Sequence, residues 1–226
     1  MIETFDGFSS ATFQFLKALS DNNKKEWFEL HKTDYQDYVL KPLQALVVGL
    51  GQFMLSIDPD FEVAPIQNKT ISRIYRDIRF SRNKSPYKTS HWITFKRPGK
   101  EWKDYPAYFF EVSPSSYRYG MGFYSACRQT MDNFRKSIDA NPGLFLSVIS
   151  FYANQEDFII EGEEYKRPLK IDLSEELRGW YNRKNLYLVS NKQIKGDYID
   201  KELISDLMHG FKAVAPLYHY LSEIGR

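Results

Sequence analysis

The chain has 226 residues, a formal net charge of +2 and one cysteine, Cys127. A near-neutral charge argues against a generic nucleic-acid coat, and a single cysteine excludes an internal disulfide framework. Residues 1–20 lack the pattern of a signal peptide, and the longest apolar run is too short to span a membrane. We therefore expect a cytoplasmic protein that does not bind a membrane. Without a recognisable linker, residues 1–226 are predicted to form a single domain.

The N-terminal quarter of the sequence has the apolar spacing of helices. Ser9 is placed to cap the first helix, which ends near residues 21–23. A second helix follows, and Pro42 either kinks it or begins a third one, which ends at the turn 58–60. The residues of the predicted buried faces are Phe13, Leu16, Leu19, Trp27, Phe28, His31, Tyr35 and Tyr38.

From about residue 61 the apolar period changes toward two, which is typical of strands. The predicted strands cover 61–66, 71–80, 91–97, 105–113 and 117–124. Because their connections are short, we expect neighbouring strands to pair as an antiparallel meander.

The C-terminal half of the chain returns mainly to helical spacing. Helices are predicted over 126–140, 142–155, 174–183 and 200–223, and short strands near 158–161 and 186–190. Pro216 should bend the last helix. The predicted fold class is α+β, with N-terminal helices, a central, mostly antiparallel sheet, and C-terminal helices packed on that sheet.

Residues 73–88 form a basic segment in which six cations stand beside one acid, Asp77. The cations are Arg73, Arg76, Arg79, Arg82, Lys84 and Lys88. A folded protein has to overcome the mutual repulsion of such a cluster. We therefore expect an anion to face it, either elsewhere in the protein or in a bound ligand.

Arg76 takes a special position if residues 71–80 are a strand. Side chains of a strand alternate between faces, so Arg76 would lie among apolar residues, opposite Arg73 and Arg79. A buried guanidinium is costly unless it is paired, and Glu111 on a neighbouring strand is the expected partner. This pairing is the favoured interpretation, and a pocket lined by Arg76 is the alternative.

The polar stretch 81–88 is predicted to be a loop, where binding residues are common. Lys84 and Lys88 would supply point charges to a phosphate, and a nearby arginine would supply a planar fork. The candidates for an acid or base are Asp77, Tyr87, His91 and Glu111, although the sequence assigns no catalytic residue. The alternative is a basic loop that binds no ligand.

Gly120 and Gly122 would leave one strand face bare, just before Ser125, the predicted N-cap of the helix 126–140. Such a strand leading into a helix N-terminus suits a phosphate or carboxylate. The competing explanation is a bulge that curves the sheet, which is the commoner reason for glycines in strands.

Metal and cofactor motifs are missing from the sequence. The four histidines have no metal-ligand spacing with one another or with Cys127, and the glycines do not form a phosphate-binding loop of the Walker type. We therefore predict no metal and no cofactor, and we expect Cys127 to be a buried structural residue.

Three segments carry a resemblance to a known family. They are residues 22–28 with Tyr35 and Pro42, residues 73–88, and residues 120–124 followed by Arg128 and Arg135. Together they resemble the domain-of-unknown-function family DUF2461 over nearly the whole chain. The resemblance implies a compact α+β fold and a bacterial source, and it brings no known activity or catalytic residue.

Three functional hypotheses follow from these patterns. The first is a binding or catalytic site for a small phosphorylated or anionic ligand. Its predicted residues are Arg73, Arg76, Arg79, Lys84, Lys88, Tyr87, Glu111 and residues 120–125. The second is a nucleic-acid-binding module in which the aromatic residues near the cations stack on bases. These aromatic residues are Tyr75, Phe80, Tyr87 and Trp92. The third is a purely structural network of salt bridges. The oligomeric state cannot be inferred from these patterns.

Overall fold

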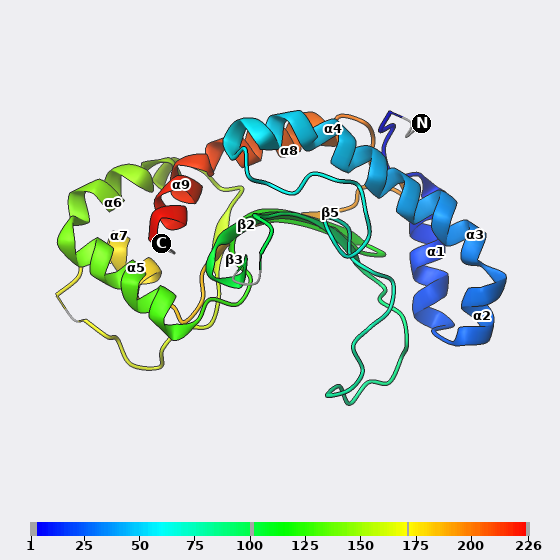
Figure 1. Cartoon of the computed structure of the whole chain (residues 1–226), viewed down its shortest axis with the longest axis horizontal. Coiled ribbons are helices and arrows are strands. Elements are labelled where there is room, and N and C mark those ends of the chain that lie inside the picture. The colour runs from blue at the N-terminus through cyan, green and yellow to red at the C-terminus, as the bar shows by residue number, and fades with distance from the viewer. Residues whose placement is uncertain (1–3, 100–101, 171, 225–226) are drawn as a thin grey trace. The chain divides into compact units, whose positions relative to one another are not determined.

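The computed structural model describes residues 4–99, 102–170 and 172–224. Over these residues the chain has helices at its N-terminal end, one five-stranded antiparallel sheet in the middle and helices at its C-terminal end (Figure 1). The predicted α+β fold class is therefore confirmed.

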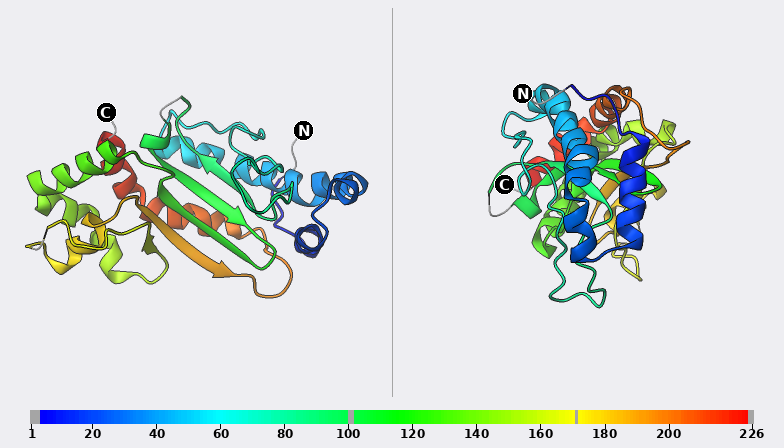
Figure 2. Two further views of the ribbon diagram at one scale, coloured as in Figure 1. Left: turned by 90° about the horizontal axis from the view of Figure 1, so that it is seen from below. Right: turned by 90° about the vertical axis from the view of Figure 1, so that its right-hand side faces the viewer.

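The N-terminal helices are α1 (Ser10–Asp21), α2 (Lys25–Leu30), α3 (Lys32–Tyr35), the π-helical turn η1 (Gln36–Leu40) and α4 (Lys41–Ile57). Figures 1 and 2 show α1 beside the continuous run from α3 to α4. Pro42 lies in the first turn of α4, which agrees with the second of the two predicted alternatives. Because a proline cannot bond the carbonyl four residues before it, the Tyr38 carbonyl accepts a bond of 2.7 Å from the buried Thr12 hydroxyl instead.

The sheet contains β1 (His91–Phe95), β2 (Pro106–Val112), β3 (Ser116–Phe123), β4 (Ile159–Glu161) and β5 (Tyr187–Gln193). The strand order is β1-β2-β3-β5-β4, and β4 pairs with β5 in antiparallel register, with Ile160 opposite Leu188. The predicted meander is confirmed for β1 to β3, and the two short strands lie close to their predicted positions.

The predicted strands 61–66 and 71–80 are wrong. The second stretch forms isolated bridges within the described residues, Ile71 with Gln67 and with Ile93, and Tyr75 with Tyr87. Its start is bonded to β1, where Ser72 N donates to Trp92 O over 2.9 Å. A few residues later it pairs with residues 86–88 instead. Because the chain changes partner so soon, no continuous ladder forms, although the residues alternate as in a strand.

Contacts divide the chain into two compact units, which are described separately. The first unit contains the chain up to Phe95, together with Phe109–Arg118 and Lys192–Met208. Its core includes Phe8 stacked on Phe110, with ring centroids 5.8 Å apart, and the buried residues of α1 and α4. The prediction of a single domain stays a prediction.

The second unit contains Lys96–Tyr108, Tyr119–Asn191 and the chain from His209. Its further helices are α5 (Arg128–Ala140), α6 (Pro142–Val148), α7 (Glu175–Tyr181) and α9 (Ala215–Ile224), with short 3-10 turns at Trp102–Asp104 and Ser150–Asn154. The helix α8 (Leu203–Ala213) ends just before α9, so the predicted long helix is broken near Pro216. The Tyr108 ring of β2 packs against the Phe211 ring of α8, with ring centroids 5.0 Å apart. This contact brings a C-terminal helix onto the sheet.

One run in the described residues, Lys32–Ile57, is long and apolar enough to cross a membrane by length and composition. This is weak evidence, because the core helices of soluble proteins meet the same criteria. Leu43, Leu46, Leu50 and Met54 of this run are fully buried, as in a core helix. The cytoplasmic location stays a prediction.

Candidate functional site

Both ends of the basic segment are brought together by backbone pairing in the first unit. Arg76 N donates to Pro86 O over 2.9 Å, and Lys88 N donates to Ile74 O over 2.8 Å. Tyr75 and Tyr87 form an antiparallel bridge between these two bonds. Residues 74–76 and 86–88 thus close the base of a protruding loop, which Figure 1 shows in blue-green, directed away from α4.

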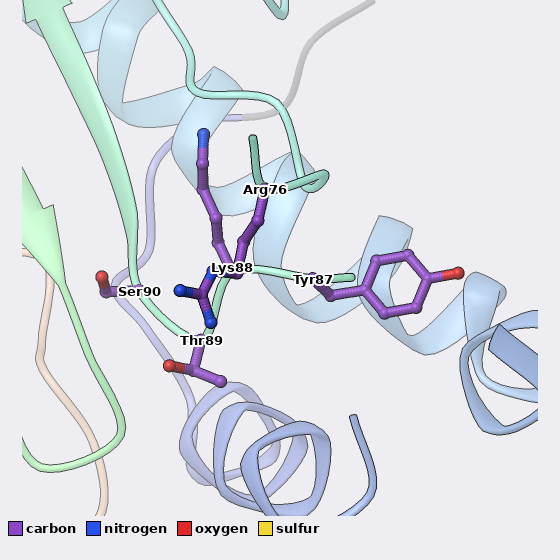
Figure 3. A pocket seen from close by; sticks show the side chains of 5 residues that line it. All are labelled: Arg76, Tyr87, Lys88, Thr89 and Ser90. Carbon is purple, nitrogen blue, oxygen red and sulfur yellow. The ribbon is translucent and has the colours of Figure 1, made fainter. Parts of the chain in front are cut away.

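A pocket of about 280 Å³ lies at this closed base. Its lining residues are Arg76, Tyr87, Lys88, Thr89 and Ser90 (Figure 3). In Figure 3 the Arg76 guanidinium lies on the side of the Thr89 and Ser90 hydroxyls, whereas the Lys88 ammonium and the Tyr87 ring point in other directions. The two hydroxyl residues were missed in the sequence, where only their position directly after Lys88 could have indicated them.

The Arg76 guanidinium has no ion pair within the described residues, and its side chain is half-buried. The predicted partner, Glu111, instead accepts two hydrogen bonds from Arg118, of 2.9 and 2.8 Å. The predicted Arg76–Glu111 pair is therefore wrong. The reason is that Arg118, on the strand next to Glu111, is a closer cation than one on a segment that leaves the sheet.

Lys88 uses its ammonium group within the protein. Its Nζ donates to the Arg73 carbonyl over 3.0 Å and lies 4.2 Å from the centre of the Trp92 ring. Partial burial, and then the positive charge of Arg73, lower the pKa of this amine. Lys88 therefore contributes positive potential to the pocket, while Arg76 carries the guanidinium that faces the hydroxyls.

Tyr87 forms a rigid wall of the pocket. Its ring is buried and stacks on Phe28, with centroids 4.3 Å apart. Burial, followed by the neighbouring Tyr75, Glu29 and Glu26, raises the pKa of its phenol. The phenol therefore stays protonated at neutral pH, and Tyr87 is not suited to act as a base.

The remaining cations belong to the protruding loop or its base. The Arg79 guanidinium donates two hydrogen bonds to the Asp77 carboxylate, of 3.0 and 2.7 Å. Hydrogen bonding from the Arg79 side chain is the main cause that holds the pKa of the Asp77 carboxyl well below its usual range. Lys84 Nζ donates to the Ile78 carbonyl over 2.9 Å. Arg73 and Arg82 are both exposed and make no ion pair within the described residues.

His91 lies fully buried in β1, one residue beyond the pocket lining. Its Nδ1 is 3.4 Å from the Ser72 hydroxyl, and its Nε2 has no hydrogen-bond partner within the described residues. Burial, and then the charge of Lys88, lower the pKa of His91 to about 3. The imidazole is therefore neutral at physiological pH and does not add to the positive charge of the pocket.

Gly120 and Gly122 belong to the second unit, where the neighbouring strand fills the space beside them. A Cβ atom at Gly120 would lie 1.9 Å from Leu188 O, and one at Gly122 would lie 2.4 Å from Leu186 O. This geometry shows a close approach of two backbones, and these glycines serve the pairing of β3 with β5.

The predicted helix cap at Ser125 is wrong, because α5 begins later and its N-cap is Cys127. The Asp104 carboxylate accepts bonds from Cys127 N, over 2.9 Å, and from the Thr130 hydroxyl, over 2.8 Å. The bond from Cys127 N contributes most to lowering the pKa of Asp104. A carboxylate of the protein itself thus occupies this helix N-terminus. Cys127 is exposed, contrary to the sequence expectation.

One known protein family matches most of the chain. The family model described as conserved hypothetical protein (DUF2461) matches residues 11–220. The chain belongs to the DUF2461 family. The family description assigns no activity, and no curated protein matches this DUF2461 chain.

Two of the segments that carry the resemblance to DUF2461 meet at the pocket. Asn23, in the segment 22–28, bonds to the backbone of Tyr87, in the segment 73–88. Phe28 adds the ring contact to Tyr87. Within its described residues, this DUF2461 protein has no cluster of three or more His, Cys, Asp or Glu side chains that could hold a metal ion.

Proposed function

We propose that this DUF2461 protein binds a small phosphorylated or otherwise anionic ligand in the pocket at Arg76. The observation that carries the proposal is a half-buried guanidinium without a carboxylate partner, beside two hydroxyl groups in one pocket. A planar guanidinium donates two parallel hydrogen bonds to a phosphate, sulfate or carboxylate, and hydroxyls can donate to the remaining oxygens. Lys88, 3.0 Å from the Arg73 carbonyl, adds positive potential nearby.

The size of the pocket indicates a small ligand or a single anionic group of a larger one. Its volume of about 280 Å³ is at the lower end of ligand pockets, which span roughly 300–1,000 Å³. Hydrogen bonds to charged groups contribute about 1.5–3 kcal/mol each. A few of them, reduced by the cost of association, correspond to dissociation constants between roughly micromolar and millimolar for an inorganic anion.

The lining residues support binding more strongly than catalysis. Arginine does not lose its proton in proteins, and burial keeps the Tyr87 phenol protonated. His91, which would be the natural proton carrier at neutral pH, is sealed behind the pocket in its neutral form. We therefore propose a binding site. The lining residues supply no acid or base for a reaction at neutral pH, so the ligand itself would have to carry any reacting group.

A thermal-shift screen tests this proposal, because a ligand that binds the folded state raises its stability. The screen would compare sulfate, phosphate, nucleotides, sugar phosphates and carboxylates at constant ionic strength. We expect at least one anion to raise the melting temperature of the wild type but not of Arg76→Ala, while Arg82→Ala responds like the wild type. Equal responses of all three proteins would contradict the proposal, because they would show non-specific screening of charge.

A nucleic-acid-binding module is a second candidate, favoured by exposed aromatic residues on the protruding loop. Phe80 is 94% exposed and Tyr75 is 53% exposed, so both rings could stack on bases. Tyr87 is buried, and Trp92 is half-buried beneath Lys88, so these two rings are not available for stacking.

Fluorescence anisotropy with a labelled single-stranded oligonucleotide separates this candidate from the first. Nucleic-acid binding predicts a salt-sensitive affinity that Phe80→Ala reduces several-fold, with Leu30→Ala, another exposed apolar residue, as the control. If no binding occurs at low salt, this candidate is excluded.

A purely structural cluster is the third hypothesis, and it predicts that the cations are paired with acids. Within residues 73–88, the described ion pair is Arg79 with Asp77. Both side chains are largely exposed, and such pairs contribute little to stability. These contacts favour a ligand over a structural role for Arg76.

A further inference from the structure

We propose that Asn23 is a positioning residue of the anion pocket, an inference that rests on the binding function proposed above. Its side-chain amide makes two hydrogen bonds to the backbone of Tyr87, 64 residues away. Nδ2 donates to Tyr87 O over 3.0 Å, and Tyr87 N donates to Oδ1 over 3.0 Å. The Asn23 amide thus bonds with both its donor and its acceptor to the backbone of one residue of the pocket wall, Tyr87.

The backbone of the pocket wall needs this amide because of the alternation in an extended chain. Pro86 O and Lys88 N face one side, where they bond to Arg76 N and Ile74 O. The N–H and C=O of Tyr87 face the other side, where no strand of the described residues lies against them. Asn23 takes the place of that missing strand, so two otherwise unbonded backbone groups are satisfied.

Ring packing fixes the same residue from the side-chain direction. Phe28, five residues after Asn23 and at 2% exposure, stacks on Tyr87, which is equally buried. The amide and the ring together connect the start of α2 to the middle of the pocket wall. Residues of the helical region therefore determine where Tyr87 lies.

The position of Tyr87 determines the distance between the two halves of the anion site. Arg76 is tied to Pro86 through its backbone N–H, and Thr89 and Ser90 come two and three residues after Tyr87. If the bonds to Asn23 were lost, residues 86–88 could shift, and the guanidinium would no longer face the hydroxyls at a fixed spacing. A misplaced donor loses affinity even when every binding group is present.

Titration calorimetry with sulfate tests the inference, because sulfate keeps its charge over the relevant pH range. We expect Asn23→Ala to weaken sulfate binding at least 10-fold. The matched control is Asn22→Ala, since within the described residues the Asn22 side-chain amide bonds to Ala18 O, at its own helix end. Affinity within 2-fold of the wild type is expected for Asn22→Ala. Wild-type affinity in Asn23→Ala would overturn the proposal.

Asn23→Asp gives a readout that a general loss of stability would not produce. An ionised carboxylate cannot donate to Tyr87 O, but a protonated carboxyl can donate to that carbonyl and accept from Tyr87 N. The charged and titratable groups around Tyr87 include Glu26, Glu29 and Tyr75, and Arg76 and Lys88 line the same pocket. Lys24 is adjacent to Asn23 in sequence. The ratio of wild-type to Asn23→Asp affinity should fall as the pH decreases from 7.5 to 4.5. A constant ratio would contradict the positioning role.

Hydrogen exchange separates a failure of this inference from a failure of the proposed function. If wild-type protein does not bind sulfate, the proposed function fails for that anion, whatever Asn23 does. The amides of Arg76 and Lys88 report the pairing of the pocket wall without a ligand. We expect both to exchange faster in Asn23→Ala than in Asn22→Ala. Equal rates in the two variants would show that Asn23 does not position this segment.

Discussion

Arg118 holds Glu111 through two hydrogen bonds to the same carboxylate oxygen, from Nε at 2.9 Å and from Nη2 at 2.8 Å. This pair explains why Glu111 is not the partner of Arg76. The sequence offers two cations for one carboxylate, and the antiparallel strands bring Arg118 next to it. Arg76 then remains in a pocket without a carboxylate partner among the described residues.

Arg118 and Arg76 should therefore differ in their effect on stability. Glu111 keeps 21% of its side chain exposed, so loss of its partner leaves a partly desolvated carboxylate. We expect Arg118→Ala to lower the free energy of unfolding by about 1 kcal/mol. Arg76→Ala should lower it by less, while abolishing the anion-dependent rise in melting temperature. Urea unfolding with and without sulfate measures both effects, and the reverse order would indicate that Arg76 is structural.

The Arg79–Asp77 pair is expected to contribute little to stability. Both groups are exposed on the protruding loop, where water and salt screen their attraction. Arg79→Ala should leave the midpoint of thermal unfolding unchanged at physiological salt. A clear decrease in that midpoint would support the structural-network hypothesis, and a parallel measurement at high salt would show whether the loss is electrostatic.

His91 should make the protein less stable at mildly acidic pH. Its pKa is about 3 when folded, against 6.5 as the ordinary value, so the unfolded chain binds a proton first as the pH falls. The contribution of His91 to the free energy of unfolding is therefore fully present above pH 6.5. Below pH 6.5 the free energy of unfolding decreases, by at most about 1.4 kcal/mol for each pH unit. Unfolding should be measured between pH 6.5 and 5, because most carboxyl groups titrate below this range. His91→Gln should remove this slope, and His209→Gln, at an exposed site, should keep it.

Gly120 should not tolerate a side chain, because a Cβ atom there would overlap the Leu188 carbonyl. We expect Gly120→Ala to lower the free energy of unfolding by at least about 2 kcal/mol, since two paired strands would have to separate. Gly179→Ala is the control, because that glycine lies exposed in α7 with nothing within 4 Å of the new Cβ. It should stabilise the protein by about 0.5–1 kcal/mol. Similar losses in both variants would contradict the close-approach explanation.

Most helices and three strands of the meander could be predicted from local patterns. The face formed by Phe13, Leu16 and Leu19 is buried as expected, because burial follows helical spacing once an apolar stripe exists. Pro42 marked the start of α4 for an equally local reason. The family resemblance, which also rests on sequence alone, is confirmed over residues 11–220.

The position of Arg76 could not be predicted in this way. Alternation over 71–80 is typical of a strand, but a strand also needs a neighbour along its whole length. Ser72 bonds to β1 and Arg76 bonds to Pro86, so the segment leaves one partner for another. The predicted pairing of Arg76 with Glu111 assumed that Arg76 lies on one face of a continuous strand over residues 71–80. That strand does not form, so the prediction was wrong.

The sequence by itself determined that a basic segment exists, that it has more cations than acids, and that glycines mark an unusual strand. Only the tertiary structure decided which of these features lie together at a pocket. Arg76 meets Thr89 and Ser90 because a long-range backbone pairing closes the loop, and Asn23 reaches Tyr87 from a distant helix end. Spacing along a chain specifies local conformation, but the partner of each hydrogen-bonding group is chosen by contacts between residues far apart in sequence.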